Sequence, residues 1–267
     1  MKQKLFYLFT ISLLVFFAAC SESDEDPTEP TDGDTAEQYY PGGVGSTFTY
    51  EGESTDSNNV KTPYQREVTY SETQSENNTE YILQKNAITV GPSTTTGEFL
   101  FRTSSTGMFI YLDPAVFTEL LDSIDTGGVS INIEAEPELR LIAYPFSSSP
   151  TWDAFVVKAS ALSGLVSLNL LELKGAYEGT EQVTVQGSSM TAEKVEYVAT
   201  IKIPESIDDI SNPDTYSVSA NAWFVKDIGL VKIEGSGLIL GAFGSGELEF
   251  EDEGGNVSEI LINYNIQ

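Results

Sequence analysis

Residues 194–203, KVEYVATIKI, divide into two alternating sets of side chains. A period of two places each set on its own face of an extended strand. One face is mostly polar, because it carries Lys194, Glu196, Thr200 and Lys202. The other face is apolar, and its members are Val195, Tyr197, Ala199, Ile201 and Ile203. The stretch therefore predicts an antiparallel strand with one buried and one solvated face.

Strand patterns recur on both sides of this stretch, so we predict one all-β domain. The connection before residue 230 is so short that Gly229 is expected to take a positive φ. In the last strand the expected apolar face is formed by Ile260, Ile262, Tyr264 and Ile266. The other expected strands are 47–53, 65–71, 80–89, 98–102, 108–112, 139–144, 154–161, 165–177, 182–185, 216–225, 230–240 and 248–250.

One short helix is expected within this β-rich chain. Asp113 can cap it, Pro114 fits its first turn, and the glycines at 127–128 end it. Its apolar positions follow helical spacing and are Phe117, Leu120, Leu121 and Ile124.

The N-terminus has the features of a secretory signal at residues 1–19. Lys2 and Lys4 precede an apolar stretch that is shorter than the roughly 20 residues of a spanning helix. The sequence from Phe17 to Cys20 resembles the lipobox of bacterial lipoproteins, in which the cysteine becomes the acylated first residue. We therefore expect palmitate-type acyl chains on Cys20 to hold the protein on a membrane. The alternative is an ordinary cleaved signal beside an incidental cysteine.

The acids that follow Cys20 predict a disordered tether at residues 20–38. This segment has no lysine or arginine and little apolar surface to bury. Its first acids resemble the signal that sends some lipoproteins to the outer face of the outer membrane; they are Glu22, Asp24, Glu25 and Asp26. The alternatives are a soluble spacer and the periplasmic leaflet. A single domain at residues 39–267 would follow.

Composition excludes several classes of function. The chain has 13 basic and 41 acidic residues, a formal net charge of −28, which would repel nucleic acid. It has no histidine and only one cysteine, which lipidation would consume. The acidic stretch 249–256 lacks the spacing of an EF-hand and is better explained by a strand and a Gly-Gly turn. We therefore expect no enzyme, no metal and no cofactor.

Four motifs, in order, resemble a broad group of secreted bacterial lipoproteins. They lie at Tyr39–Tyr50, at Tyr144–Trp152, at Val183–Val195 and at Trp223–Lys232, so the resemblance spans most of residues 39–234. Phe48 stands where the group usually has tryptophan. The resemblance implies a strongly curved antiparallel sheet or half-barrel, akin to the lipoprotein-carrier fold, wrapped around a helix. It also suggests apolar ligands.

The resulting hypothesis is a surface lipoprotein that binds an apolar or amphipathic small molecule in the concave face of its sheet. The expected lining residues are Phe117, Leu120, Leu121, Trp152 and Trp223. Trp223 alternatively caps the edge of the core. A competing hypothesis is an accessory protein for a glycan or protein partner, with a packed concavity. A more distant one is a carboxylate-dependent hydrolase. The sequence does not indicate an oligomeric state.

Overall fold

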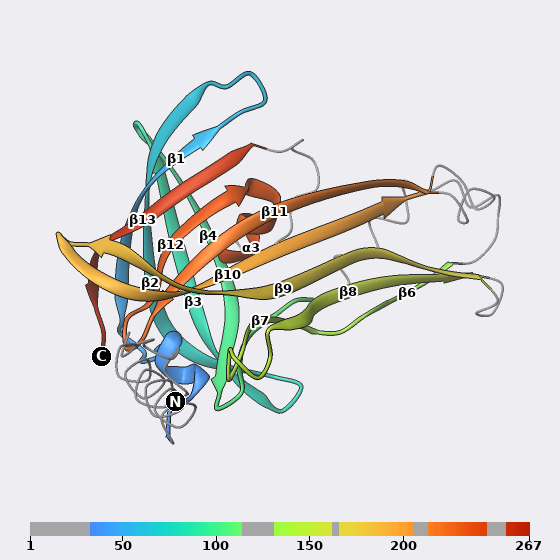
Figure 1. Cartoon of the computed structure of the whole chain (residues 1–267), viewed down its shortest axis with the longest axis horizontal. Helices are drawn as coiled ribbons and strands as arrows, with labels where there is room; N and C mark the ends of the chain where they lie inside the picture. The colour runs from blue at the N-terminus through green and yellow to red at the C-terminus, as the bar shows by residue number, and fades with distance from the viewer. Residues whose placement is uncertain (1–32, 114–130, 162–165, 205–212, 245–254) are drawn as a thin grey trace, which may run out of the picture. The chain divides into compact units, whose positions relative to one another are not determined.

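The computed structural model describes residues 33–113, 131–161, 166–204, 213–244 and 255–267. Their thirteen strands form one antiparallel sheet in the order β6-β8-β9-β10-β11-β12-β13-β1-β2-β3-β4-β5-β7 (Figure 1). The strands are β1 (Thr47–Thr55), β2 (Lys61–Glu76), β3 (Thr79–Val90), β4 (Ser93–Ser104), β5 (Gly107–Tyr111), β6 (Ile131–Ala135), β7 (Glu138–Ala143), β8 (Thr151–Ala161), β9 (Val166–Val185), β10 (Ser188–Ile203), β11 (Asp214–Val225), β12 (Gly229–Ser236) and β13 (Asn256–Asn265). Two short helices accompany them, η1 (Ala36–Tyr39) and α3 (Gly237–Gly244).

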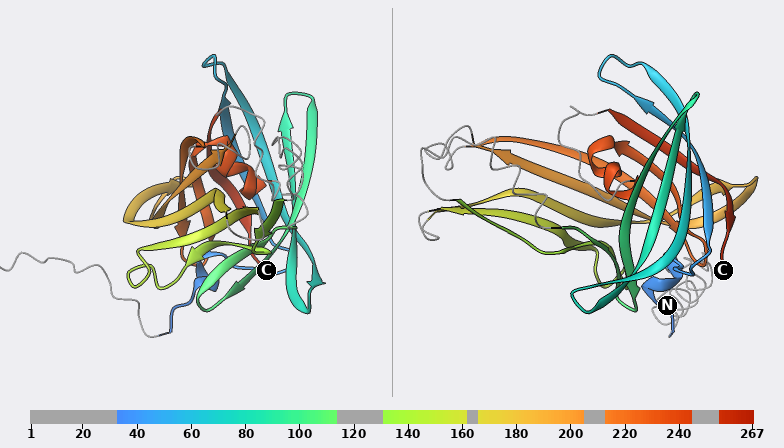
Figure 2. Two further views of the ribbon diagram at one scale, coloured as in Figure 1. Left: turned by 90° about the vertical axis from the view of Figure 1, so that its right-hand side faces the viewer. Right: turned by 180° about the vertical axis from the view of Figure 1, so that it is seen from behind.

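The sheet is strongly curved and does not close, since β6 and β7 end it without pairing to each other (Figure 2). Side chains bridge the opening instead. Trp152 of β8 donates its indole N–H to the carbonyl of Arg140 in β7 at 3.0 Å, and the Tyr197 hydroxyl of β10 donates to the next carbonyl, that of Leu141, at 2.6 Å. Leu141 is an extra residue at a β-bulge against β5. The bulge explains how the successive carbonyls of Arg140 and Leu141 can both accept hydrogen bonds from side chains across the opening.

Both halves of the sheet contribute fully buried side chains to the core. Tyr197 and Phe224 are fully buried on one half of the sheet, and Phe101 and Leu139 on the other. In β9, Gly175 is paired with both Trp152 and Tyr197. Because Gly175 has no side chain, the Trp152 ring can lie directly over it. The all-β curved architecture expected from the sequence is thus confirmed.

Most strands are found where the residue pattern predicts them, and Gly229 has the expected positive φ, at +103°. The expected segments 165–177 and 182–185 belong to one strand, β9, while β6 was not predicted. The helix expected after Asp113 and the strand at 248–250 lie outside the described residues.

Two expectations were wrong near the C-terminal end. The strand predicted to reach residue 240 ends at Ser236, and the helix α3 follows. An unbroken apolar run such as Leu238–Leu240 fits a buried helix as well as a buried strand. In β13 the buried residues are Glu259 and Leu261 rather than Ile260 and Ile262, because a bulge at Ile262 opposite β1 shifts the phase.

The segment before β1 packs against the sheet. Ala36 and Tyr39 of η1 are buried in the core, Lys226 pairs with Asp34 at 2.7 Å, and the Asp227 amide donates to the Gln38 carbonyl at 2.6 Å. Residues 34–39 therefore contact the folded sheet. No helix among the described residues has the length and apolarity to cross a membrane.

Candidate functional site

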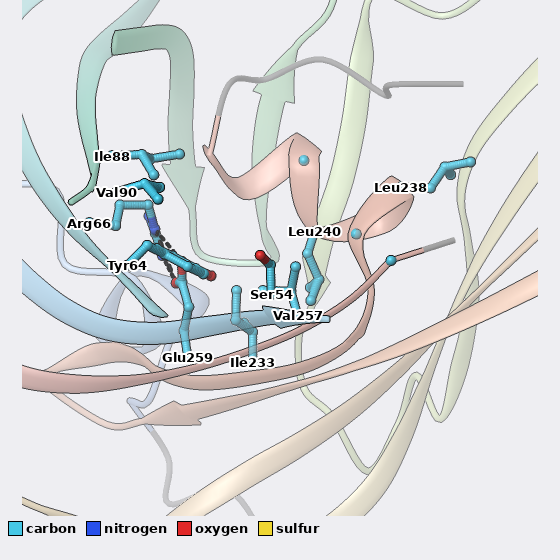
Figure 3. Close-up of a pocket in the computed structure, with 13 residues that line it drawn as sticks. Ser54, Tyr64, Arg66, Ile88, Val90, Ile233, Leu238, Leu240, Val257 and Glu259 are labelled. Carbon is cyan, nitrogen blue, oxygen red and sulfur yellow. Dashed lines mark hydrogen bonds and ion pairs between the residues drawn. The ribbon is translucent and has the colours of Figure 1, made fainter. Parts of the chain in front are cut away.

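A pocket of about 330 Å³ opens on the concave face between α3 and strands β1, β2, β3, β12 and β13 (Figure 3). Its walls are mostly aliphatic, and three side chains with polar groups stand together at one end. The lining residues are Ser54, Tyr64, Arg66, Ile88, Val90, Ile233, Gly237, Leu238, Leu240, Gly241, Gly255, Val257 and Glu259. Its volume is at the lower end of the ~300–1,000 Å³ typical of small-molecule sites.

A buried ion pair forms the polar end of the pocket. Arg66 of β2 binds Glu259 of β13 through Nε, 3.0 Å from both carboxylate oxygens, and through Nη2, 2.6 Å from Oε2. Their side chains are only 3% and 4% exposed. The guanidinium also lies over the Tyr50 ring, 4.3 Å from its centroid. The bidentate geometry and the aromatic contact offset part of the desolvation cost of burying both charges.

Tyr64 is the third residue of the polar end, and its side chain extends over Gly52 of the neighbouring strand β1. Gly52 of β1 is paired with Tyr64 on one side and with Glu259 on the other. Because Gly52 has no side chain, the Tyr64 ring lies over it and its hydroxyl donates to Glu259 Oε1 at 2.8 Å. Figure 3 shows Tyr64, Arg66 and Glu259 converging from strands that are far apart in the sequence.

A hydrogen-bond network continues from the ion pair into the core. Arg66 Nη1 donates to Asn86 Oδ1 at 3.2 Å, and Gln84 Nε2 donates to the same oxygen at 3.1 Å. The Tyr40 hydroxyl donates to Gln84 Oε1 at 2.9 Å. The donors Arg66 Nη1 and Gln84 Nε2 fix the orientation of the Asn86 amide. The buried Nδ2 of Asn86 finds no partner among the described residues. The network therefore holds Arg66 in place from behind.

Burial and the neighbouring charges shift the pKa values of Tyr64 and Arg66 at this end of the pocket. Burial raises the pKa of the Tyr64 hydroxyl far above its ordinary value, and the neighbouring Glu259 charge raises it further. Burial by itself lowers the pKa of Arg66, but the attraction and hydrogen bonds of Glu259 outweigh it and raise that pKa. Tyr64 is thus neutral and Arg66 cationic at physiological pH.

No family model and no curated protein matches the chain. Among solved structures, a candidate lipoprotein from Parabacteroides distasonis is 14% identical, with a TM-score of 0.46, and the match covers 87% of this chain and 99% of that one. A candidate exported protein with a YmcC-like fold from Bacteroides fragilis is 13% identical, covering 84% and 96%, with a TM-score of 0.44. The hypothetical lipoprotein YmcC of Escherichia coli is 10% identical, covering 87% and 90%, with a TM-score of 0.30.

The structure places the two tryptophans away from this pocket. Trp152 is buried against Gly175 and Tyr197, where it bridges the sheet opening. Trp223 is 3% exposed, donates to Glu181 Oε2 at 3.0 Å, and has Lys232 over its ring at 4.1 Å. Neither is among the residues that line the pocket. The other expected site residues lie outside the described residues and are Phe117, Leu120, Leu121, Cys20, Glu22, Asp24, Glu25 and Asp26.

The residues of the polar end, Tyr64, Arg66 and Glu259, were not predicted from the sequence. A signal for one of them exists, since Arg66 shares the apolar phase of Val68 and Tyr70 in β2. Glu259 likewise alternates with Leu261. A charged residue in a buried phase indicates a paired charge. Within the described part of the chain, no group of three or more acidic, histidine or cysteine residues is arranged to hold a metal ion.

Proposed function

We propose that the protein is a non-enzymatic, lipid-anchored binding module whose concave pocket holds an amphipathic small molecule. The observation that carries this proposal is the division of the pocket into two ends. Aliphatic side chains such as Ile88, Leu240 and Val257 form the walls, and the Arg66–Glu259 pair with Tyr64 forms the polar end. An apolar chain and a polar head would each meet a matching surface.

The same proposal places the protein on a membrane. Acyl chains on Cys20 would anchor it, and the acids at 22–26 would direct it to the outer membrane and its outer face. The formal net charge of the whole chain, −28, disfavours its contact with anionic head groups. A tethered domain would then meet amphiphiles released from, or destined for, the membrane.

A catalytic role is not proposed. Glu259 is the one carboxylate among the described residues that line the pocket, and both its oxygens already accept hydrogen bonds from Arg66. A glycosidase-type mechanism requires two carboxyl groups facing each other across the substrate.

The accessory-protein hypothesis is supported by a different observation. Much of the concave face is filled by packed aromatic side chains, among them Tyr197, Phe101 and Trp152. In that alternative the small pocket is only a packing gap, and the outer surface binds a glycan or a protein.

A substitution that fills the pocket distinguishes the binding-module proposal from the accessory-protein hypothesis. Val90 lines the pocket and is 40% exposed, so Val90→Trp would place an indole in its mouth with little cost to the core. Val44→Trp is the matched control, because Val44 is 45% exposed and does not line the pocket. The full-length protein would be produced in a Gram-negative host, and native mass spectrometry would detect amphiphiles that co-purify. We expect wild type and Val44→Trp to carry a ligand and Val90→Trp to lose it by about tenfold. Equal occupancy in all three would contradict pocket binding.

A further inference from the structure

The polar end of the pocket carries no net charge. Arg66 and Glu259 neutralise each other at 2.6 Å, and Tyr64 is a neutral phenol. The nearly complete burial of the pair leaves little solvent to screen a third charge. A ligand head with a full charge would therefore be desolvated without a counter-ion, which is strongly unfavourable.

The polar end of the pocket also has hydrogen-bond donors and acceptors that are not engaged by the described residues. A guanidinium has five N–H groups, and the bonds to Glu259 and Asn86 engage one on each nitrogen of Arg66. Two N–H donors of Arg66 remain. The Glu259 oxygens keep further lone pairs, and the Tyr64 oxygen can accept a bond while its proton is donated. A head that both donates and accepts would satisfy both kinds of group.

We propose that the pocket selects single-chain amphiphiles whose head is an uncharged hydroxyl or amide group, over those that carry a carboxylate or an ammonium. This selectivity rests on the proposed binding function. A neutral hydroxyl donates to Glu259 and accepts from Arg66 without disturbing their ion pair. The modest cavity, about 330 Å³, suits one aliphatic chain rather than several.

Photo-crosslinking tests the selectivity. The full-length protein in phosphatidylcholine nanodiscs would be exposed to dodecanol, dodecanoate and dodecylammonium probes that each carry a diazirine in the chain. Labelled peptides from residues 237–241 and 255–259 report the pocket, and Val90→Trp supplies the background for each probe. We expect dodecanol to label these peptides about tenfold more than either charged probe. Equal or stronger labelling by a charged probe would overturn the selectivity alone. No labelling above background by any probe would overturn the binding function and the selectivity together.

Glu259→Gln supplies a sharper test, because it keeps the side-chain shape and leaves Arg66 without its counter-charge. The preferred probe should then change from dodecanol to dodecanoate. Tyr64→Phe is the charge-conserving control, and it should weaken dodecanol labelling without changing the order of the probes. Circular dichroism would confirm that both variants fold. An unchanged order in folded Glu259→Gln would overturn the proposal, and if that variant does not fold, the order of the probes on wild type decides.

Discussion

The ring of Tyr64 lies directly over Gly52, so that a Cβ atom on this glycine would clash with Tyr64 Cζ. Gly52 lies in β1, between β2 and β13. Because Gly52 has no side chain, the Tyr64 ring can extend across β1 and its hydroxyl can donate to Glu259. Trp152, Gly175 and Tyr197 repeat the arrangement across β8, β9 and β10. In both places a glycine in the middle strand lets a large side chain reach across two strands.

Gly52→Ala should therefore displace the Tyr64 ring and break its bond to Glu259. Overpacking of this kind costs roughly 1–3 kcal/mol of unfolding free energy. The cost should nearly vanish in a Tyr64→Ala background, because the ring that clashes is then absent. Urea unfolding of the two single variants and the double variant measures this coupling. Additive losses would show that Gly52 is required for another reason.

The Arg66–Glu259 pair predicts a strong asymmetry between single and double substitutions. Arg66→Met leaves Glu259 buried and unpaired, and should cost about 3–5 kcal/mol. The double variant Arg66→Met, Glu259→Leu should recover most of this loss, since no buried charge remains.

The exposed pair Lys61–Glu53, whose side chains are 66% and 43% exposed, is the control for this experiment. Lys61→Met should cost at most about 1 kcal/mol. Chemical denaturation of the four proteins gives all the values. A double variant no more stable than Arg66→Met would contradict the ion-pair account.

Local patterns were sufficient for much of the fold. The alternation in 194–203 and the short connection at Gly229 each depend on neighbouring residues, and both predictions are confirmed. The bulge at Ile262 was not predictable, because it depends on the register of β13 against β1. The helix α3 escaped prediction for a related reason: its apolar run is buried from several sides and shows no period.

The candidate site could not be predicted because its residues are far apart in the sequence. Arg66 and Glu259 are 193 residues apart and meet only because β1 lies between β2 and β13. Burial of Arg66 could be inferred from its phase, but its partner could not be chosen among 41 acidic residues. The two tryptophans were predicted to line the site because they are large aromatic residues. In the structure both indoles form hydrogen bonds elsewhere in the fold.

A second Tyr–Glu–Arg cluster predicts a pH dependence. Hydrogen bonds from Arg102 lower the pKa of Glu138, burial opposes this effect, and a bond from Tyr81 adds to the lowering. A carboxyl whose pKa is lower in the folded state adds stability above its unfolded pKa of about 4.3, and this contribution is lost as the pH falls through the folded value. Glu138→Gln should therefore lose stability at neutral pH and approach wild type below about pH 4. Urea midpoints at a series of pH values measure the difference, and a constant gap would contradict it.

Cys20→Ser should abolish acyl incorporation and release the protein from membranes. The measurement is labelling with a clickable palmitate analogue, followed by membrane fractionation after a high-salt wash. Replacing Glu22, Asp24, Glu25 and Asp26 by alanine is the companion variant, and it should keep acylation but lose accessibility to protease on intact cells. Persistent membrane association of unacylated Cys20→Ser would contradict the lipobox assignment.

The sheet opening gives the last prediction, because edge carbonyls of β7 depend on two side chains from the far end of the sheet. Trp152→Phe keeps an aromatic ring over Gly175 but removes the donor to the Arg140 carbonyl. An unpaired buried carbonyl costs about 1–3 kcal/mol, and the loss should be concentrated at the opening. Hydrogen exchange should therefore become faster in β5, β7 and β8 and stay unchanged in β1 and β2. Trp223→Phe is the control, since the indole of Trp223 donates to the Glu181 carboxylate and not to a carbonyl of β7, and it should leave exchange in β7 unchanged. Uniform acceleration across the whole sheet in Trp152→Phe would show that the opening has no separate stability.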